Sequence, residues 1–263
     1  MKAIKVHAKL HWGFSIRKPF FSASQPTFKV PPPSTLIGAL SRAYAYLEKL
    51  PETLVERLGK RIDYYSTSVK LLTTCKWASL ALIDEHLLPK EGLVETQDIM
   101  RALIAPYLRR ENIYPGSRML YAPQAHGKVY FPDLDILITY LTDDAHADIL
   151  RRTAWGITAI GCKESIACVV DVKVLNLSIR EDEIITTRFY FESDLSKGIV
   201  EGDYIEDYLT IPSRDHFKLA STKYTLKAFI IPINNVRVRI DSEKAVVLHD
   251  GYDNYIIRKE VIS

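Results

Sequence analysis

Near the start of the chain, in the segment 3–11, apolar and polar side chains alternate strictly from Ile4 to His11. A period of two is typical of a β-strand with one buried and one open face, so this segment is predicted to be a half-buried strand. The open face would be basic throughout, because it carries only lysine and histidine side chains, Lys5, His7, Lys9 and His11.

The spacing becomes that of an α-helix after the prolines at residues 31–33. Apolar side chains then recur at intervals of three or four, which predicts a helix over about 35–49. Ser34 or Thr35 would cap its N-terminus. Gly38 costs a helix about 1 kcal/mol relative to alanine, and we expect it to permit close approach of another backbone.

The same reasoning predicts the remaining elements. In chain order they are a short helix at 52–60, strand-forming residues at 67–83, a helix at 96–109 inside an irregular, hairpin-like insertion of about 84–131, a strand at 135–141, a helix at 145–158 and a strand at 166–175. Short strands follow at 184–192, 224–233, 236–240, 245–249 and 254–262.

These elements predict an α+β protein with two domains. The order β, α, β, insertion, β, α, β over residues 1–175 is that of the ferredoxin-like fold (βαββαβ), which RNA-recognition modules share. The short strands of residues 176–263 predict a small β-rich C-terminal domain.

The charge of the chain is distributed unevenly. Residues 1–132 carry a net charge of +9 and residues 133–263 a net charge of −6. The first 47 residues hold seven basic side chains and no acidic one. This asymmetry favours an anionic partner for the N-terminal half, of which nucleic acid is the commonest. A solvated basic face without a partner is the alternative.

Several classes of protein are disfavoured. No apolar run approaches the roughly 20 residues of a membrane span, and the start of the chain does not resemble a signal peptide, so we expect a cytoplasmic protein with no membrane partner. Common nucleotide-binding, zinc-protease and hydrolase motifs are absent. Cys75, Cys162 and Cys168 form no C-x-x-C pair and are expected to be small buried thiols. We expect no metal and no cofactor.

Two short motifs have the chemistry of phosphate binding. Pro31–Gly38 (PPPSTLIG) delivers two hydroxyls and exposed N–H groups to a helix start, where an anion can bind. Gly161–Ser165 (GCKES) joins a predicted helix to a strand, and its lysine and serine can bind phosphate oxygens. Simple helix capping and a tight turn with a surface Lys–Glu pair are the respective alternatives.

A third stretch, residues 107–131, interleaves basic side chains with tyrosines. Basic groups can bind a nucleic-acid backbone while aromatic faces stack on bases. An amphipathic hairpin whose tyrosines pack on the body is the alternative. The acidic segments 181–183 and 201–207 are interpreted as solvated loops, or else as a surface for a protein partner.

Four segments together resemble the Cas-five family of CRISPR proteins, a branch of the RAMP superfamily. They are Gly13–Arg17 (GFSIR), Pro31–Leu40 (PPPSTLIGAL), Tyr121–Asp133 (YAPQAHGKVYFPD) and Gly161–Ser165 (GCKES). The sequence resembles the archaeal type I-A version of the family. The resemblance covers about residues 3–175, and the C-terminal part shares only its length and β character.

The resemblance implies an RRM-like ferredoxin domain with a thumb-like insertion, followed by a small β domain. It implies a non-catalytic subunit of the type I interference complex, Cascade, that binds and caps the 5′ handle of crRNA in antiviral defence. The implied partners are crRNA, the backbone RAMP subunit and the large subunit. A purely scaffolding protein that meets RNA only through its neighbours is a further hypothesis.

The residues expected to hold RNA carry a basic or hydroxyl group that suits a phosphate oxygen. They are Arg17, Lys18, Ser34, Thr35, Arg42, Arg109, Arg118, His126, Lys128, Lys163 and Ser165. In one branch of the family the protein is a metal-independent endoribonuclease that uses tyrosine, histidine and lysine. The corresponding alternative here is a nuclease built from Tyr44, Tyr46, His126 and Lys128.

Overall fold

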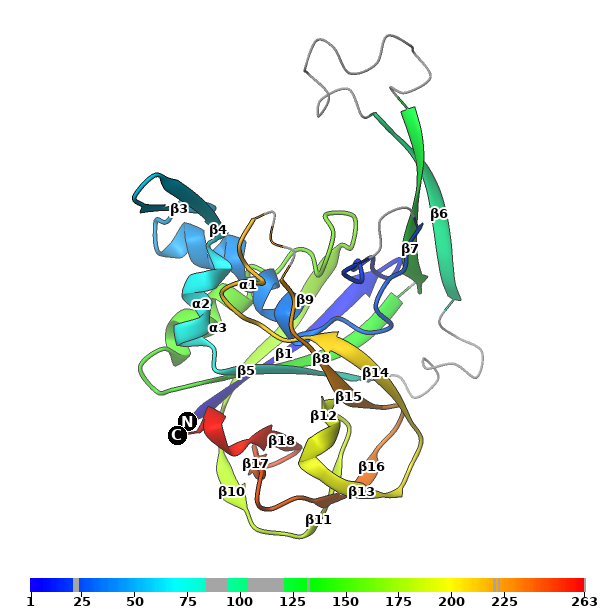
Figure 1. The fold of residues 1–263 in the computed structure, drawn as a ribbon. Coiled ribbons are helices and arrows are strands. Elements are labelled where there is room, and N and C mark those ends of the chain that lie inside the picture. The colour runs from blue at the N-terminus through cyan, green and yellow to red at the C-terminus, as the bar shows by residue number, and fades with distance from the viewer. Residues whose placement is uncertain are drawn as a thin grey trace.

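A computed structural model of the chain describes residues 1–20, 24–83, 94–103, 121–131, 133–219, 221 and 223–262. The fold is mixed α/β, mostly strands with few helices, as the pattern predicts (Figure 1). No helix in this part of the chain has the length and apolar character to cross a bilayer.

A four-stranded antiparallel sheet forms the centre of the first half, in the order β5–β8–β1–β9. Two helices, α1 and α3, lie against one face of this sheet (Figure 1). The apolar side of β1 packs beneath α1 because their periodic apolar positions, such as Val6 and Leu36, join one core. The bounds are β1 Lys2–His11, α1 Pro33–Leu47, α2 Ser68–Thr74, β5 Trp77–Leu82, β8 Asp133–Thr142, α3 Ala147–Ala154 and β9 Ala167–Asn176.

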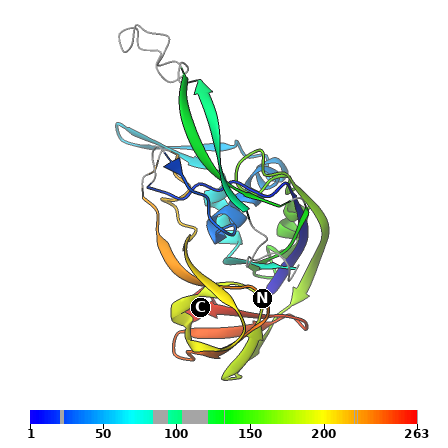
Figure 2. The ribbon, with the colours of Figure 1, turned by 90° about the vertical axis from the view of Figure 1, so that its right-hand side faces the viewer.

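The described part of the insertion is a long hairpin that projects from the body (Figures 1 and 2). It consists of β6 (Val94–Leu103) and β7 (Tyr121–Tyr130), which pair antiparallel along their whole length. A short strand, β2 (Ser24–Gln25), runs parallel to β7. The predicted helix at 96–109 is therefore wrong over 96–103, because strand pairing across the insertion overrides a short helical pattern. Residues 104–109 lie outside the described residues.

Another helix prediction, at 52–60, is also wrong. The structure has a hairpin there, β3 (Thr53–Leu58) and β4 (Arg61–Ser66), and Gly59 at its turn has a φ of +62°. A right-handed helix cannot continue through that conformation, which glycine adopts readily. The strand-forming region 67–83 contains both α2 and β5, so the strand prediction holds only for its second part.

The second half consists of short antiparallel strands arranged in three-stranded sheets below the central sheet (Figure 1). The predicted strands are confirmed in position, except that 184–192 is divided into two strands and 254–262 is a strand only as far as Arg258. The bounds are β10 Ser178–Arg180, β11 Ile184–Thr187, β12 Phe191–Glu192, β13 Ser196–Glu201, β14 Tyr204–Thr210, β15 Leu226–Pro232, β16 Val236–Ile240, β17 Ala245–His249 and β18 Asn254–Arg258. Short 3₁₀ turns occupy Ser193–Leu195 and Lys259–Val261.

Three further details correct the sequence analysis. Part of the acidic segment 201–207 belongs to β14, whose buried Leu209 packs into the same core as β1, so it is not a free loop. The helix α1 is capped by Pro32 without a side-chain hydrogen bond, not by Ser34 or Thr35. Of the free cysteines only Cys75 is buried, whereas Cys162 is half-buried and Cys168 is exposed.

Candidate nucleic-acid interface

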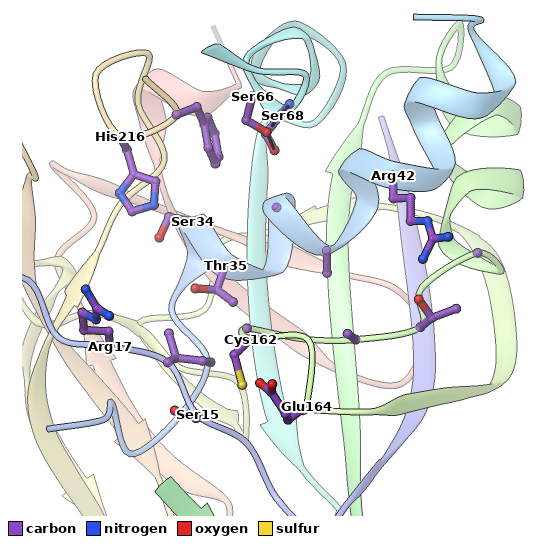
Figure 3. Close-up of a pocket in the computed structure, with 18 of the residues that line it drawn as sticks. Ser15, Arg17, Ser34, Thr35, Arg42, Ser66, Ser68, Cys162, Glu164 and His216 are labelled. Carbon is purple, nitrogen blue, oxygen red and sulfur yellow. Dashed lines mark hydrogen bonds between the residues drawn. The ribbon is translucent and has the colours of Figure 1, made fainter. Parts of the chain in front are cut away.

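A pocket of about 830 Å³ lies beside the first half of α1 (Figure 3). Ligand sites typically have volumes of about 300–1,000 Å³. The walls come from the loop after β1, α1, the turn between α3 and β9, the base of β7, and a segment of the second half. Its polar lining consists of Ser15, Arg17, Ser34, Thr35, Arg42, Ser66, Ser68, Lys128, Thr158, Cys162, Glu164 and His216.

Hydrogen bonds through Ser15 join the first loop to the GCKES turn. The Cys162 N–H donates to the Ser15 carbonyl at 3.1 Å, and the Ser15 N–H donates to Ser165 Oγ at 2.9 Å. Gly161 makes this approach possible, because a Cβ on it would lie 2.5 Å from the Ile16 side chain. The observed role of this glycine is to bring two protein segments together.

The same loop fixes the base of the projecting hairpin. Phe14 and Val129 exchange two backbone hydrogen bonds, and the Ser15 hydroxyl donates to the Gly127 carbonyl at 2.9 Å. Lys128 lies between these two anchored residues and lines the pocket. Ordinary backbone pairing thus brings a residue of the insertion next to the helix start, although the two are about ninety positions apart in the sequence.

Gly38 lines this pocket and does not have the predicted role. A Cβ built on it would meet nothing within 4 Å, so no other backbone approaches α1 there. The close approach is made instead by Gly156, whose added Cβ would overlap the Cβ of Ala43. Gly38 therefore leaves open space in the pocket.

Residues 213–219 of the second half, called the strap below, complete the wall opposite the GCKES turn. The Ser66 N–H donates to the Phe217 carbonyl at 2.8 Å, and the Leu219 N–H donates to the Tyr64 carbonyl at 2.8 Å. Through these bonds the strap pairs with the edge of β4 that does not pair with β3. The pocket is consequently formed by both halves of the chain.

The charge of the pocket is positive. Arg17, Arg42 and Lys128 line it, and none of them forms an ion pair within the part of the chain that the structure describes. One carboxylate, Glu164, also lines it, and its pKa is lowered, chiefly by a hydrogen bond to the Cys162 side chain. Three cations against one carboxylate, with several hydroxyls, form a set of groups that suits phosphate oxygens.

The basic face of β1 has the opposite character. Three of its lysine and histidine side chains are engaged by carboxylates that lie far away in the sequence. The pairs are Lys5 with Asp250 (2.9 Å) and Asp253, and His7 (2.5 Å) and Lys9 (3.3 Å) with Asp135. Lys5 is also buried. The interpretation of this face as a uniformly basic surface is therefore wrong.

Other predicted contacts are engaged within the protein or lie away from the pocket. Lys18 forms an ion pair with Asp207 of β14 at 2.9 Å. Ser34 is buried and shares a hydrogen bond with the Thr210 hydroxyl at 2.7 Å, although it also lines the pocket. Lys163 extends into solvent from the turn.

The structure leaves three predicted residues undescribed in whole or in part. Arg109 and Arg118 lie outside the described residues. The backbone of His126 belongs to β7, opposite Asp98 of β6 and Gln25 of β2. Their assignment to RNA binding stays a prediction.

Two of the four alternative nuclease residues, Tyr44 and Tyr46, do not line the pocket. Tyr44 packs against the core, Tyr46 is 85% exposed, and neither lines the cavity that holds Lys128. Within the described ranges, no group of three or more histidine, cysteine, aspartate and glutamate side chains could hold a metal ion.

Sequence reasoning missed the contribution of the strap. His216 and Phe217 line the pocket, together with Ser66 and Ser68 near the end of β4. No local signal identifies these residues, because their position depends on pairing between β4 and a segment about 150 positions further along the chain.

The fold and the pocket define a strand-rich α/β protein with a basic, hydroxyl-lined cavity. No family model matches the chain. Two curated proteins of Saccharolobus solfataricus are each 31% identical to it: the CRISPR system aCascade subunit Cas5 1 over 252 residues, and the CRISPR-associated protein Cas5 3 over 256 residues. Each alignment covers 94% of this chain and 97% of the relative.

A solved structure shares the fold. The crystal structure of a CRISPR protein from Archaeoglobus fulgidus aligns over 98% of this chain and 100% of that chain, with a TM-score of 0.59 and 19% sequence identity. With relatives of this similarity over nearly its whole length, the chain belongs to the Cas5 (Cas-five) family of CRISPR proteins. The resemblance noted from the four sequence motifs is thereby confirmed.

Proposed function

We propose that this chain is a non-catalytic subunit of a type I CRISPR Cascade complex that binds crRNA and caps its 5′ handle. The observation that carries the proposal is the pocket lined by Arg17, Arg42 and Lys128, which have no ion-pair partners among the described residues. The similarity to a protein named as a Cascade subunit supports the assignment to that complex.

The chemistry of the pocket suits an RNA backbone. Phosphate contacts supply most of the affinity of such interfaces and make it dependent on salt. Guanidinium groups bind phosphate oxygens in a bidentate manner, and the Thr35 hydroxyl lies at the same cavity to add a hydrogen bond. The target sequence would be read by base pairing of the guide RNA rather than by the protein.

The same proposal includes the division of the chain into two domains. Residues 1–175 form a ferredoxin-like, RRM-like RNA-binding domain, and the β6–β7 hairpin is its thumb-like insertion. The antiparallel strand order β9–β1–β8–β5, with helices on one face, supports this. Residues 176–263 form the C-terminal β-rich domain. The protein partners are the backbone RAMP subunit and the large subunit of the complex.

The proposal is tested by RNA binding and cleavage in one reaction. The full-length protein is incubated with end-labelled CRISPR-repeat RNA in EDTA, and the products are run on native and denaturing gels. We expect a shifted, intact RNA. A discrete metal-independent cut would instead support the endoribonuclease, and absence of any shift at low salt would contradict handle binding.

A charge-removal variant connects the binding to the pocket. Arg17, Arg42 and Lys128 are changed together to glutamine. Each lost contact to single-stranded RNA lowers the salt slope of log K by about 0.7, so the triple variant should lose about 2 of that slope. The matched control changes the surface residues Arg180, Arg237 and Lys244, which pair with acidic neighbours, and should leave affinity nearly unchanged.

A further inference from the structure

The strap is held firmly on both sides of His216. Besides its two backbone bonds to β4, Lys218 forms an ion pair with the buried Asp63 at 2.8 Å. On the other side of His216, Arg214 pairs with Glu56 of β3 and lies over the Tyr65 ring at 4.7 Å. The backbone of His216 itself donates to Ser213 Oγ at 3.1 Å. The strap is thus a fixed wall of the pocket.

The imidazole of His216 is oriented by its aromatic neighbours. Its ring meets Phe217 edge to face with centroids 5.2 Å apart, and Tyr224 with centroids 5.5 Å apart. Figure 3 shows the ring pointing from the strap toward Ser34 and Thr35 at the start of α1. Burial lowers the pKa of His216, so the ring is neutral at neutral pH and can donate or accept through one nitrogen.

Neither ring nitrogen of His216 has a hydrogen-bond partner among the described residues. Nδ1 is buried, and it is the one buried side-chain nitrogen or oxygen in this part of the chain without a partner. Buried polar atoms without partners are uncommon in proteins and call for an explanation. Nε2 is not buried in this way, so it is the polar atom that the side chain can present to a molecule in the pocket.

The pocket therefore combines two kinds of chemistry. Arg17, Arg42 and Lys128 suit a charged phosphate, whereas His216 and Phe217 offer one uncharged hydrogen-bonding atom beside an aromatic ring. The cavity of about 830 Å³ lies within the size range of ligand sites, so it can hold a nucleotide together with its phosphate.

We propose that His216 recognises the base of one unpaired RNA nucleotide through Nε2, so that the strap of the second half determines base preference at one position of the bound RNA. The inference rests on the proposed function, because it takes RNA as the occupant of the pocket. A neutral group in contact with a base edge contributes to specificity, whereas the cations hold the backbone regardless of sequence. His216 is accordingly a specificity-determining residue.

The test separates base recognition from general RNA binding. The full-length protein is titrated with the 5′ handle RNA of a CRISPR repeat, and with versions in which one position at a time is abasic or 2′-deoxy. The wild-type protein should show one position at which removal of the base weakens binding by about 3- to 10-fold, the range of one hydrogen bond. At that position the 2′-deoxy change should have little effect.

Three substitutions of His216 test whether Nε2 is the atom that recognises the base. His216→Gln puts an amide near the place of Nε2 and should preserve the discrimination in part. His216→Asn puts its amide near the place of Nδ1, and His216→Phe retains an aromatic ring without nitrogens. Both of these should bind intact and abasic RNA equally, with an unchanged salt slope. Thermal unfolding of each variant checks that it folds, and the Gln–Asn pair decides the question if the Phe variant does not.

The outcomes distinguish this inference from the proposed function. If the wild-type protein binds the handle but the Phe and Asn variants keep its base discrimination, the role of His216 is overturned while handle binding stands. The same holds if sensitivity to His216 follows the 2′-hydroxyl instead of the base. If no RNA binds even at low salt, the proposed function fails and the inference fails with it.

Discussion

Two groups of basic side chains in the first half of the chain have opposite surroundings. The cations on β1 are paired with carboxylates, and Lys5 is buried between Asp250 and Asp253. The cations of the pocket, Arg17 and Arg42, have no such partners among the described residues. The comparison teaches that basic residues of one half of the chain can be neutralised within the fold in one place and left without a carboxylate partner in another. What distinguishes them is the position of the acidic side chains.

The largest effect is expected on stability, when the buried ion pair between Lys5 and Asp250 is broken. Lys5→Met leaves Asp250 without its cation in a site where the carboxylate side chain is fully buried. Removing one partner of a buried pair destabilises a protein by about 3–5 kcal/mol. We expect a large fall in the melting temperature, measured by circular dichroism, with RNA affinity retained at temperatures where the variant is folded.

The matched control for that prediction is Lys173→Met, because Lys173 is an exposed lysine paired with Asp171 on the same sheet. Exposed pairs contribute about 0–1 kcal/mol, so its melting temperature should stay close to that of the wild type. A loss of RNA affinity in the folded Lys5 variant would contradict the separation between the two groups.

The pocket can be blocked without disturbing the helix that lines it. At Gly38 the space for a side chain is open, so Gly38→Gln and Gly38→Glu should both fold. The two side chains have similar size and helix propensity. The glutamate also places a negative charge beside Arg42 in the cavity. We expect RNA affinity to fall about 10-fold or more for glutamate, and less for glutamine, in a filter-binding titration.

The control at this position is Gly38→Ala, which adds only a methyl group. It should raise the free energy of unfolding by up to about 1 kcal/mol, because alanine favours the helix. Equal RNA binding by the alanine and glutamate variants would show that the pocket does not hold the RNA.

A smaller effect on RNA affinity is expected when one cation is removed from each group, and this compares the two groups directly. Arg42→Gln removes one cation of the pocket that has no ion-pair partner among the described residues, and it should weaken RNA binding several-fold and lower the salt slope by about 0.7. Lys9→Gln removes a cation that is paired with Asp135, and it should change affinity little. Binding measured from low to moderate salt checks both, and equal slopes for the two variants would contradict the comparison.

The smallest effect is expected in the pH dependence of stability, through the ion pair between Asp63 and Lys218 of the strap. A hydrogen bond from Lys218 holds the pKa of Asp63 below its ordinary value of 3.8. A lowered carboxylate pKa contributes stability that is present above the unfolded-state value and is lost as the pH falls through the folded-state value. The difference in melting temperature between wild type and Asp63→Asn should therefore be constant above about pH 5 and shrink below pH 3.8. A difference that grows toward acid would contradict this assignment.

Much of the fold could be predicted because it depends on local periodicity. The strand at β1 and the helix α1 have clear periods and bury the apolar positions that those periods select. The hairpin β3–β4 could not be predicted in this way. Val55 and Leu58 of that hairpin are exposed, so their spacing was no sign of a buried helix face. Its conformation is decided by the turn at Gly59 and by pairing with the strap.

The candidate site could also be predicted in part, because some of its residues belong to short sequence motifs. The motifs around Arg17, Thr35 and the GCKES turn were visible in the sequence, and the structure brings them to one pocket with Arg42 and Lys128. The contribution of His216 was not visible, since it is the β4–strap pairing that carries it to the cavity. The engagement of Lys18 by Asp207 was hidden for the same reason.

The sequence by itself determined the periodic elements, the basic character of the first half and the similarity to Cas5 proteins. Only the tertiary structure decided which basic side chains are neutralised and which have no ion-pair partner in the part of the chain that the structure describes. The physical reason is that Coulombic and hydrogen-bonding partners act over a few ångströms, irrespective of distance along the chain. Lys5 and Asp250 are 245 positions apart and yet 2.9 Å from each other, a proximity that no local pattern encodes.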